Sequence, residues 1–565
     1  MKTVIKYIKP YLLSVIFCLV IKGVAAFFEL LIPRMLAVII DEDVPRGDLT
    51  AVLRNGGIML SFALLTFIFN VLGNRISAHA TGKIAKSLRR DLFEKTIRLD
   101  AAQTDKFGLS SLTSRLTSDT YNITNFLARM QRIGIRAPMM LIGGIVITLT
   151  IDVKLALVLI AILPLVSLTV YSITKRSIPV YNEEHSILDK LIRRVDETSS
   201  GIRVIKALSK VEYEKKRFHE VSEELAAKEI SAGRLTSLTK PINDFIFYMG
   251  LCLVILVSAL ATKDGGATAG KLLAFMTYFT IILNHMIMMS RVFVQTSRAF
   301  SSAARIEEVL LTETEISVSS SECYGGEGYI VFDNVSFSYN KKAMNVEDVS
   351  FSIGKGETFG IIGATGSGKT TLVNLLLRLY DVDRGNIYIG GKNIKSIPKD
   401  ELYSMFGVAF QNDFIYRGTL SENIAFHRPV TDEKIAEAVE ISQAEEFVSS
   451  DERGILREAT TGGTNLSGGQ KQRLLIARAV VGNPDIIILD DSSSALDYKT
   501  DLRLRRAINR ELKTTTVIVS QRIASVMSAD KIIVIDEGKI VGLGKHEELL
   551  ETCDIYRQIA EVQLK

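Results

Sequence analysis

Cysteine is scarce in this chain, and the few cysteines present are far apart. The 565 residues include four, at Cys18, Cys252, Cys323 and Cys553, and their spacing matches no metal-binding pattern. Two lie in apolar runs and two in the polar second half of the chain. The pattern favours reduced thiols over a disulfide framework of the kind found in small secreted domains.

A large excess of charge of one sign is also lacking. Lys and Arg number 68 and Asp and Glu 63, so the formal net charge is +5, and a nucleic-acid-binding role has no electrostatic support. A cleavable leader is not indicated either. Lys2, Lys6 and Lys9 precede an apolar segment that continues without a small-residue cleavage site, so we expect a retained membrane anchor.

Long apolar runs, in contrast, dominate the chain up to about residue 310. The mean hydropathy of +0.23 is unusual for a soluble protein of this length and indicates membrane spans. A helix needs about 20 apolar residues to cross a bilayer, so the short third run must share its helix with the mixed segment before it. The six runs are centred on Leu12–Ile40, Ile58–Leu72, Met139–Leu149, Leu155–Val170, Phe245–Leu260 and Leu272–Met289.

Basic residues follow the second and fourth runs, whereas the opposite turns are acidic or mixed. The basic residues are Lys83, Lys86, Arg89, Arg90 and Lys95, then Lys175, Arg176, Lys190, Arg193 and Arg194; the opposite turns hold Asp41-Glu42-Asp43, Asp152 and Lys263-Asp264. Since basic residues concentrate on the cytoplasmic side of a cell membrane, we expect both termini in the cytoplasm. The two long, charged connections have helical periodicity and are predicted to be cytoplasmic extensions of the spanning helices.

Polar groups interrupt several spans. Each intramembrane charge costs about 2.5 to 3.5 kcal/mol on insertion scales, so such groups face either other protein groups or a wet cavity. Both remain open from the sequence. Met286, Met288 and Met289 suit varied apolar ligands or ordinary packing. The interrupting residues are Lys22, Glu29, Arg34, Asn243, Asp244, Asn284, His285 and Arg291.

The polar second half begins with alternating apolar residues and contains a glycine-rich loop between a buried strand and a helix. The strand is Thr358–Ile362, the loop is Gly363-Ala364-Thr365-Gly366-Ser367-Gly368, and Lys369-Thr370-Thr371 opens the helix. Backbone N–H groups of such a loop close around phosphate oxygens at a helix N-terminus. Lys369 would reach the β and γ phosphates, and Thr370 would ligate Mg²⁺. This strand–loop–helix order predicts an α/β P-loop NTPase domain.

A second apolar strand, Ile486–Asp490, ends in a carboxylate. After a phosphate-binding loop, an aspartate at the end of a buried strand is the expected holder of Mg²⁺, directly or through water. Between these two features stands the run Leu466-Ser467-Gly468-Gly469-Gln470.

With this run and Lys471-Gln-Arg473, the chain resembles an ATP-binding-cassette exporter half-transporter over essentially its full length. Further matching segments are Gly201–Lys206 and Ala304–Glu308. The resemblance implies that residues 1–310 form a membrane domain of six spans, 311–327 a linker and 328–565 a nucleotide-binding domain. It also implies short coupling helices near Ser111–Thr117 and Ser200–Lys206.

The resemblance assigns roles to individual residues as well. Tyr339 matches the aromatic residue that stacks on adenine, and Gln411 matches a glutamine that joins Thr370 and Asp490 around Mg²⁺. Leu466–Gln470 would face the ATP bound to a second cassette, and Asp497 would lie at the interface between the two. Release of the γ-phosphate would then loosen the pair of cassettes.

Two catalytic positions and one segment before the signature depart from the family pattern. The family's general base follows Asp490 and is usually Glu, whereas this chain has Asp491, whose carboxylate lies one methylene further back. A misplacement near 1 Å can cost about 10²-fold in rate. The usual histidine of the switch segment is Gln521, which can hydrogen-bond phosphate but cannot carry a positive charge. Thr460-Thr461-Gly462 also replaces an acidic and a basic residue often found before the signature.

Together these departures predict a degenerate site that retains ATP and an intact signature that serves a second, non-identical half-transporter. Within the family, the chain resembles the bacterial heterodimeric multidrug exporters. We therefore expect hydrophobic or amphipathic substrates and hydrolysis mainly at the partner's site. We also expect contact with membrane lipid but not with nucleic acid. Two alternatives stay open: a dedicated lipid, peptide or siderophore transporter, and a channel-like subunit that ATP gates. The six spans exclude a soluble cassette protein.

Overall fold

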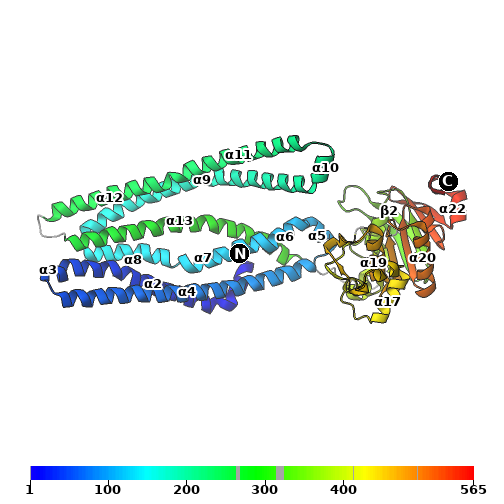
Figure 1. Cartoon of the computed structure of the whole chain (residues 1–565), viewed down its shortest axis with the longest axis horizontal. Coiled ribbons are helices and arrows are strands. Elements are labelled where there is room, and N and C mark those ends of the chain that lie inside the picture. The colour runs from blue at the N-terminus through cyan, green and yellow to red at the C-terminus, as the bar shows by residue number, and fades with distance from the viewer. Residues whose placement is uncertain (1, 263–267, 314–323, 412, 493, 565) are drawn as a thin grey trace. The chain divides into compact units, whose positions relative to one another are not determined.

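The computed structural model describes residues 2–262, 268–313, 324–411, 413–492 and 494–564. The chain forms two compact units. The helical unit comprises Met1–Arg98 and Leu109–Thr312, and the α/β unit comprises Leu99–Gly108 and Glu313–Lys565 (Figure 1). The Lys263-Asp264 turn, Cys323 and predicted linker residues 314–323 lie outside the described residues. Cys18, Cys252 and Cys553 are free thiols, as expected.

The helical unit consists of long helices, several of them much longer than a bilayer is thick. Six helical segments are long and apolar enough to cross a membrane: Val4–Arg46, Leu49–Ile97, Leu109–Ile151, Val153–Ser200, Val211–Val257 and Ala269–Met289. The helices that build them are α1 (Lys2–Ile8), α2 (Leu12–Val38), α3 (Val44–Arg46), α4 (Leu49–Ile97), α6 (Leu109–Ser114), α7 (Thr120–Ile133), α8 (Arg136–Ile151), α9 (Val153–Ser200), α10 (Ile202–Ala207), α11 (Val211–Ser237), α12 (Thr239–Thr262) and α13 (Ala269–Leu311). Two π-helical turns, η2 (Ile39–Asp43) and η3 (Arg115–Asp119), interrupt the series.

Six spans are confirmed, and so is the expectation for the third. The apolar stretch of α8 is only 16 residues long, and the segment from Leu109 to Ile151 supplies the rest of the span. The charged connections are helical too. At 49 residues, α4 is about 74 Å long, far more than the ~30 Å hydrocarbon core, and α9 and α11 lie side by side beyond their apolar parts (Figure 1).

Interhelix pairing accounts for two of the intramembrane charges. The Lys22 ammonium is 2 % exposed and donates to the side-chain oxygens of Asn70 and Asn74, each at 2.9 Å. Glu29 accepts two bonds from Arg136, at 2.7 and 2.8 Å. Lys22 and Glu29 therefore stabilise the packing of α2 on its neighbours. The side chain of Arg291 lies outside the described residues.

The α/β unit contains two main sheets. The six-stranded sheet has the order β12-β11-β3-β10-β9-β6, parallel except at β12, and the four-stranded sheet β2-β1-β4-β5 is antiparallel. The strands are β1 (Ile330–Phe337), β2 (Val346–Ile353), β3 (Thr358–Ile362), β4 (Arg384–Ile389), β5 (Lys392–Asn393), β6 (Phe406–Ala409), β9 (Ile486–Asp490), β10 (Thr515–Ser520), β11 (Lys531–Asp536) and β12 (Lys539–Gly544). A short pair, β7 (Gly418–Thr419) and β8 (Glu458–Ala459), stands apart.

Helices cover these sheets and divide the apolar interior into separate cores. In one core, apolar side chains of β3 and of the helix that follows it pack against side chains from both sheets. A second core lies among the helices between β6 and β9. The helices of the unit are α14 (Lys369–Leu376), α15 (Lys399–Ser404), α16 (Leu420–Ala425), α17 (Asp432–Ile441), α18 (Glu445–Ser449), α19 (Gly468–Val480), α20 (Tyr498–Glu511), α21 (Ile523–Val526), α22 (His546–Thr552) and α23 (Asp554–Leu564).

A short helix lies just before the first predicted coupling-helix position. Ser111–Thr117 lies within α6 and η3 of the helical unit, whereas the short helix that belongs to the α/β unit is α5 (Ala101–Phe107). Asp100 caps α5 in a capping box with Gln103, and Gly108 ends it at a φ of 75°, a conformation that glycine adopts without strain. A short helix does occur at the second predicted place, as α10.

Candidate nucleotide site

Three parallel strands bring the predicted nucleotide-binding residues to one edge of the sheet. Strand β10 lies between β3 and β9, with Ser520 opposite Ile362 and Val519 opposite Asp490. The segments that follow these strands must therefore leave the sheet together. They are the glycine-rich loop after β3, Asp491 after β9 and Gln521 after β10, so the sheet gathers residues that are up to 158 positions apart in the chain.

Glycine is required by the backbone of the loop. Gly366 and Gly368 have φ values of 83° and 106°, and a Cβ on Gly363 would lie 2.1 Å from the carbonyl oxygen of Ile535. Gly368 is also the N-cap of α14 and has no side chain to satisfy the first N–H groups of that helix. These amides are available to an anion at the N-terminus, as expected of a phosphate site.

Lys369 folds back over the same loop. Its ammonium donates to the carbonyl oxygens of Gly363 at 2.8 Å and Ala364 at 2.6 Å. Burial lowers the pKa of the ammonium, while Asp490 and Asp491 oppose that shift. The cation is thus held at the loop, where phosphate oxygens could replace the two carbonyl partners.

Asp490 suits a divalent cation. The residue is 2 % exposed, and its Oδ2 atom has no hydrogen-bond partner among the described residues. Burial raises the pKa of the carboxyl group, and a hydrogen bond from Thr370 partly offsets the rise. A buried carboxylate with a spare oxygen beside a threonine hydroxyl fits the oxygen ligands that Mg²⁺ prefers. Ser367 has a buried hydroxyl that likewise lacks a partner among the described residues.

The carboxylate of Asp491 is placed beside Gln411. Gln411 Nε2 donates to Asp491 Oδ2 at 3.3 Å, and the backbone of Asp491 has a φ of 46°. Its own N–H donates to Val519 at 2.8 Å. Burial raises the pKa of the Asp491 carboxyl group, opposed by Arg522 and Lys369. The glutamine and the short carboxylate thus lie together at the edge of the sheet that carries the glycine-rich loop.

Gln521 reaches the loop from the next strand. The hydroxyl of Thr365 donates to Gln521 Oε1 at 3.3 Å, and the Gln521 carbonyl accepts from Gln563 at 2.8 Å. The position expected to sense the terminal phosphate therefore carries a neutral amide in contact with the phosphate-binding loop.

The signature run opens helix α19 in the second core. Ser467 is the N-cap and forms a capping box with Gln470, whose N–H donates to the Ser467 hydroxyl at 3.3 Å. Leu466 is buried, whereas Ser467, Gly468 and the first turn are accessible. Further along α19, Gln472 Nε2 donates to the Ser494 hydroxyl at 3.0 Å, and Gln472 Oε1 accepts from the Ala495 N–H at 2.8 Å. Asp497 caps α20 through Thr500.

Comparison with known proteins decides the family. The ABC transporter transmembrane region model matches residues 12–286, and the ABC transporter model matches residues 346–494. The uncharacterized ABC transporter ATP-binding protein YfiB of Bacillus subtilis is 33% identical over 100% of this chain and 98% of its own length. The chain belongs to the ABC transporter family. It is an exporter half-transporter, with the membrane and ATP-binding parts fused in one multi-pass membrane protein whose ATPase activity is coupled to transport.

Two further proteins are similar to this ABC transporter. A fatty acid ABC transporter ATP-binding/permease protein of Mycobacterium bovis is 30% identical, covering 91% of this chain and 82% of that protein. A solved structure of a bacterial Atm1-family ABC exporter with ATP bound has a TM-score of 0.82 and 20% identity, covering 99% of this chain and 100% of the other. The Atm1-type fold is thereby established.

Three residues around Tyr339, the residue matched to the adenine-stacking aromatic, were not predicted from the sequence of this ABC transporter. Tyr339 is 44 % exposed, and its ring meets that of Tyr380 edge-on with centroids 4.9 Å apart. Asn374 donates to the Tyr339 hydroxyl at 3.1 Å, and Tyr380 donates to Asp105 at 2.5 Å. A cavity of about 570 Å³ lies among these groups. The one signal in the sequence was a tyrosine pair that flanks the phosphate loop.

Proposed function

We propose that this chain is the degenerate-site subunit of a heterodimeric exporter that moves hydrophobic or amphipathic compounds out of the cytoplasm. One observation carries the proposal: the short carboxylate of Asp491 and the neutral Gln521 occupy the general-base and switch positions of an otherwise complete nucleotide site. The glycine loop, Lys369 and Asp490 retain what binding requires, while both groups that would promote cleavage are altered.

In this proposal the ATP-binding residues are Tyr339, residues 363–371 and Gln411, with Mg²⁺ held by Thr370, Gln411 and Asp490. Residues 1–310 form the membrane domain, 311–327 the linker and 328–565 the nucleotide-binding domain, with both termini in the cytoplasm. Asp105 and the rest of α5 then act as part of the nucleotide-binding side, because Leu99–Gly108 packs within the α/β unit.

The partner subunit is inferred from the signature. Ser467 and Gly469 are retained and accessible. Within the described part of the chain, Ser467 forms its hydrogen bonds with Gln470 and not with this chain's own phosphate loop. Such a surface is useful if ATP on a second cassette docks there. We infer that the second half-transporter supplies the glutamate and histidine that this chain lacks, and carries out most of the hydrolysis.

Two substrate classes are compatible with this assignment. The first class is varied amphipathic compounds, including drugs. The methionines of α13 favour this class because their side chains adapt to different apolar ligands. One of them, Met286, accepts a hydrogen bond from the Ser167 hydroxyl. A dedicated lipid substrate is the second candidate, and it is favoured by the relative that is described as a fatty acid transporter.

The experiment compares this chain alone with the chain coexpressed with the half-transporter of a neighbouring reading frame. We expect slow hydrolysis alone and rapid hydrolysis by the pair. Rapid hydrolysis by this chain as a homodimer contradicts the proposal. Vesicles containing the pair are then tested for ATP-dependent accumulation of a cationic dye, a labelled fatty acid and a labelled peptide; uptake of the fatty acid but of no dye replaces the multidrug assignment with the lipid one.

A further inference from the structure

Helix α13 ends one residue before the chain leaves the helical unit. The chain passes from the helical unit to the α/β unit after Thr312, immediately beyond α13, and returns to the helical unit at Leu109, where α6 begins. The cytoplasmic end of α13 and the α6–η3 segment are therefore each within a few residues of the α/β unit.

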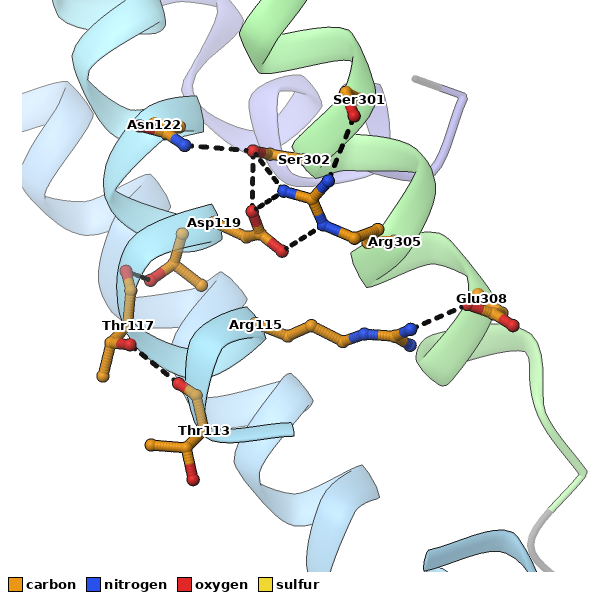
Figure 2. A network of polar contacts seen from close by, with 10 residues as sticks. Thr113, Arg115, Thr117, Asp119, Asn122, Ser301, Ser302, Arg305 and Glu308 are labelled. Atoms are coloured by element: carbon orange, nitrogen blue, oxygen red, sulfur yellow. Dashed lines mark hydrogen bonds and ion pairs between the residues drawn. The ribbon is translucent and has the colours of Figure 1, made fainter. Parts of the chain in front are cut away.

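A buried carboxylate joins these two segments. Asp119, the last residue of η3, is 1 % exposed. It accepts from two nitrogens on one edge of the Arg305 guanidinium, Nε to Oδ2 at 2.8 Å and Nη2 to Oδ1 (Figure 2). Ser302, one turn earlier on α13, donates to Asp119 Oδ1 at 2.8 Å and accepts from Asn122 at 3.2 Å. A bidentate arginine–carboxylate pair fixes geometry as well as charge.

A second ion pair lies beside the first. In this pair the cation is on η3 and the anion is on α13, the reverse of the first pair. Arg115, the first residue of η3, donates to Glu308 Oε2 at 2.9 Å (Figure 2). The Arg115 side chain is 8% exposed and that of Glu308 is 53%. Each segment thus contributes one cation and one anion to these two ion pairs, and each of these cations lies opposite the other segment's anion.

This alternation selects a single register. Arg305 and Glu308 are three residues, or about 4.5 Å, apart along α13. Because Asp119 pairs with the earlier and Arg115 with the later of them, the two segments run antiparallel. A slip of one turn in one direction brings Arg115 opposite Arg305. A slip in the other direction brings Asp119 opposite Glu308. Both alternatives place like charges together, at least one of them buried, which is costly.

The far end of α13 is held by another carboxylate. Asp41, in the π-helical turn η2, accepts from the N–H groups of Gly270 at 2.6 Å and Lys271 at 2.9 Å and from the Thr268 hydroxyl. A Cβ on Gly270 would lie 2.7 Å from Asp41 Cγ, so glycine permits this approach. α13 is therefore anchored at both ends to elements outside itself, and a slip along its axis must break both anchors.

We propose that Asp119 and Arg305, together with Arg115 and Glu308, are positioning residues that lock the end of α13 to α6–η3 in one register, so that both connections to the α/β unit respond to ATP as one body. Breaking the lock separates the two responses. It leaves the nucleotide site itself intact, because these four residues lie outside that site.

The test is hydrogen exchange of the full chain in its native membrane assembly, with and without ATP and Mg²⁺. In the wild type, peptides covering residues 109–119 and 300–312 change exchange together, with the same ATP midpoint. In each of the variants Arg305→Gln and Asp119→Asn, we expect the ATP-dependent change in exchange to persist in one segment and to fall about tenfold in the other. Tenfold is a usual size for coupling between sites. A role in stability alone would speed exchange in both segments and leave both responses in place, which overturns the proposal. No ATP response in either wild-type segment overturns it too.

A charge exchange provides the second variant in case burial of Asp119 prevents folding. Glu308→Arg changes a half-exposed side chain and places two cations opposite each other, so the paired response should be lost. Adding Arg115→Glu restores opposite charges and should restore it. Lys215→Gln, which breaks an exposed ion pair within α11, is the matched control and should leave the paired response unchanged. Equal responses in Glu308→Arg and the wild type overturn the proposal.

Discussion

The hydroxyl of Tyr380 donates to Asp105 Oδ2 at 2.5 Å, so the short helix α5 is bonded to an aromatic residue whose ring contacts that of Tyr339. Tyr339 in turn accepts from Asn374 on α14, the helix that follows the glycine-rich loop. Contacts therefore run without a gap from α5 through two tyrosines to α14. Burial raises the pKa of Tyr380, and Asp105 raises it further, which keeps the phenol protonated as a donor.

The first prediction concerns this hydrogen bond. Tyr380→Phe keeps the ring beside Tyr339 and removes the bond to the Asp105 carboxylate, a class of bond worth about 1.5 to 3 kcal/mol when buried and less at this partly exposed position. Exchange of the amides of α5 should accelerate several-fold, with ATP affinity almost unchanged. Tyr380→Ala also removes the ring and should weaken ATP binding, measured by titration with a fluorescent nucleotide. Tyr498→Phe, at an exposed ring, is the control; equal exchange in Tyr380→Phe and wild type contradicts the prediction.

The second prediction restores the catalytic groups. In the assembled pair, Asp491→Glu with Gln521→His should raise turnover at this chain's site, by up to about 10² if carboxylate reach is the main defect. Hydrolysis is measured with the partner's own site inactivated. Adding Lys369→Ala should abolish the gain, which assigns it to this site. Unchanged hydrolysis in the double variant would count against a degenerate site.

The third prediction concerns the signature surface. Ser467→Arg places a large cation where the partner's ATP is expected to dock, so hydrolysis by the pair should fall strongly while ATP binding at Lys369 persists. The substitution also removes a helix cap, worth about 1 kcal/mol. Thr419→Ala removes a capping box of the same type from α16 and controls for that loss of stability. Similar losses of hydrolysis in both variants would show that the cap, and not the docking surface, is responsible.

Local patterns in the sequence were enough to predict the six spans and the strand–loop–helix at the phosphate site, because periodicity and glycine placement determine both. Contacts between distant segments were not predictable in this way. The partners of Lys22 are 48 and 52 residues away, and nothing near Lys22 identifies Asn70 or Asn74. Helix α5 is a different case. The signals that define it were present in the sequence as Asp100, Gln103 and Gly108, but no helix was predicted there.

The last prediction compares two buried aspartates of the α/β unit. Asp490 is buried with one oxygen lacking a partner among the described residues, and burial raises its pKa. The ionised form therefore destabilises the nucleotide-free protein above the folded-state pKa, and this penalty is lost as the pH falls. Asp490→Asn should raise the unfolding temperature at neutral pH without ligand, and should abolish the additional stabilisation by ATP that depends on Mg²⁺.

Asp501 is the matched control, because it is equally buried but paired with Arg505 at 2.8 Å. Removal of one partner from a buried ion pair usually costs about 3 to 5 kcal/mol, so Asp501→Asn should lower the unfolding temperature, with the Mg²⁺-dependent shift retained. Opposite signs for the two substitutions are the expected result of thermal unfolding with and without ATP and Mg²⁺. If Asp490→Asn also destabilised the ligand-free protein, its carboxylate would be serving the fold, and its assignment as a cation ligand would lose its physical support.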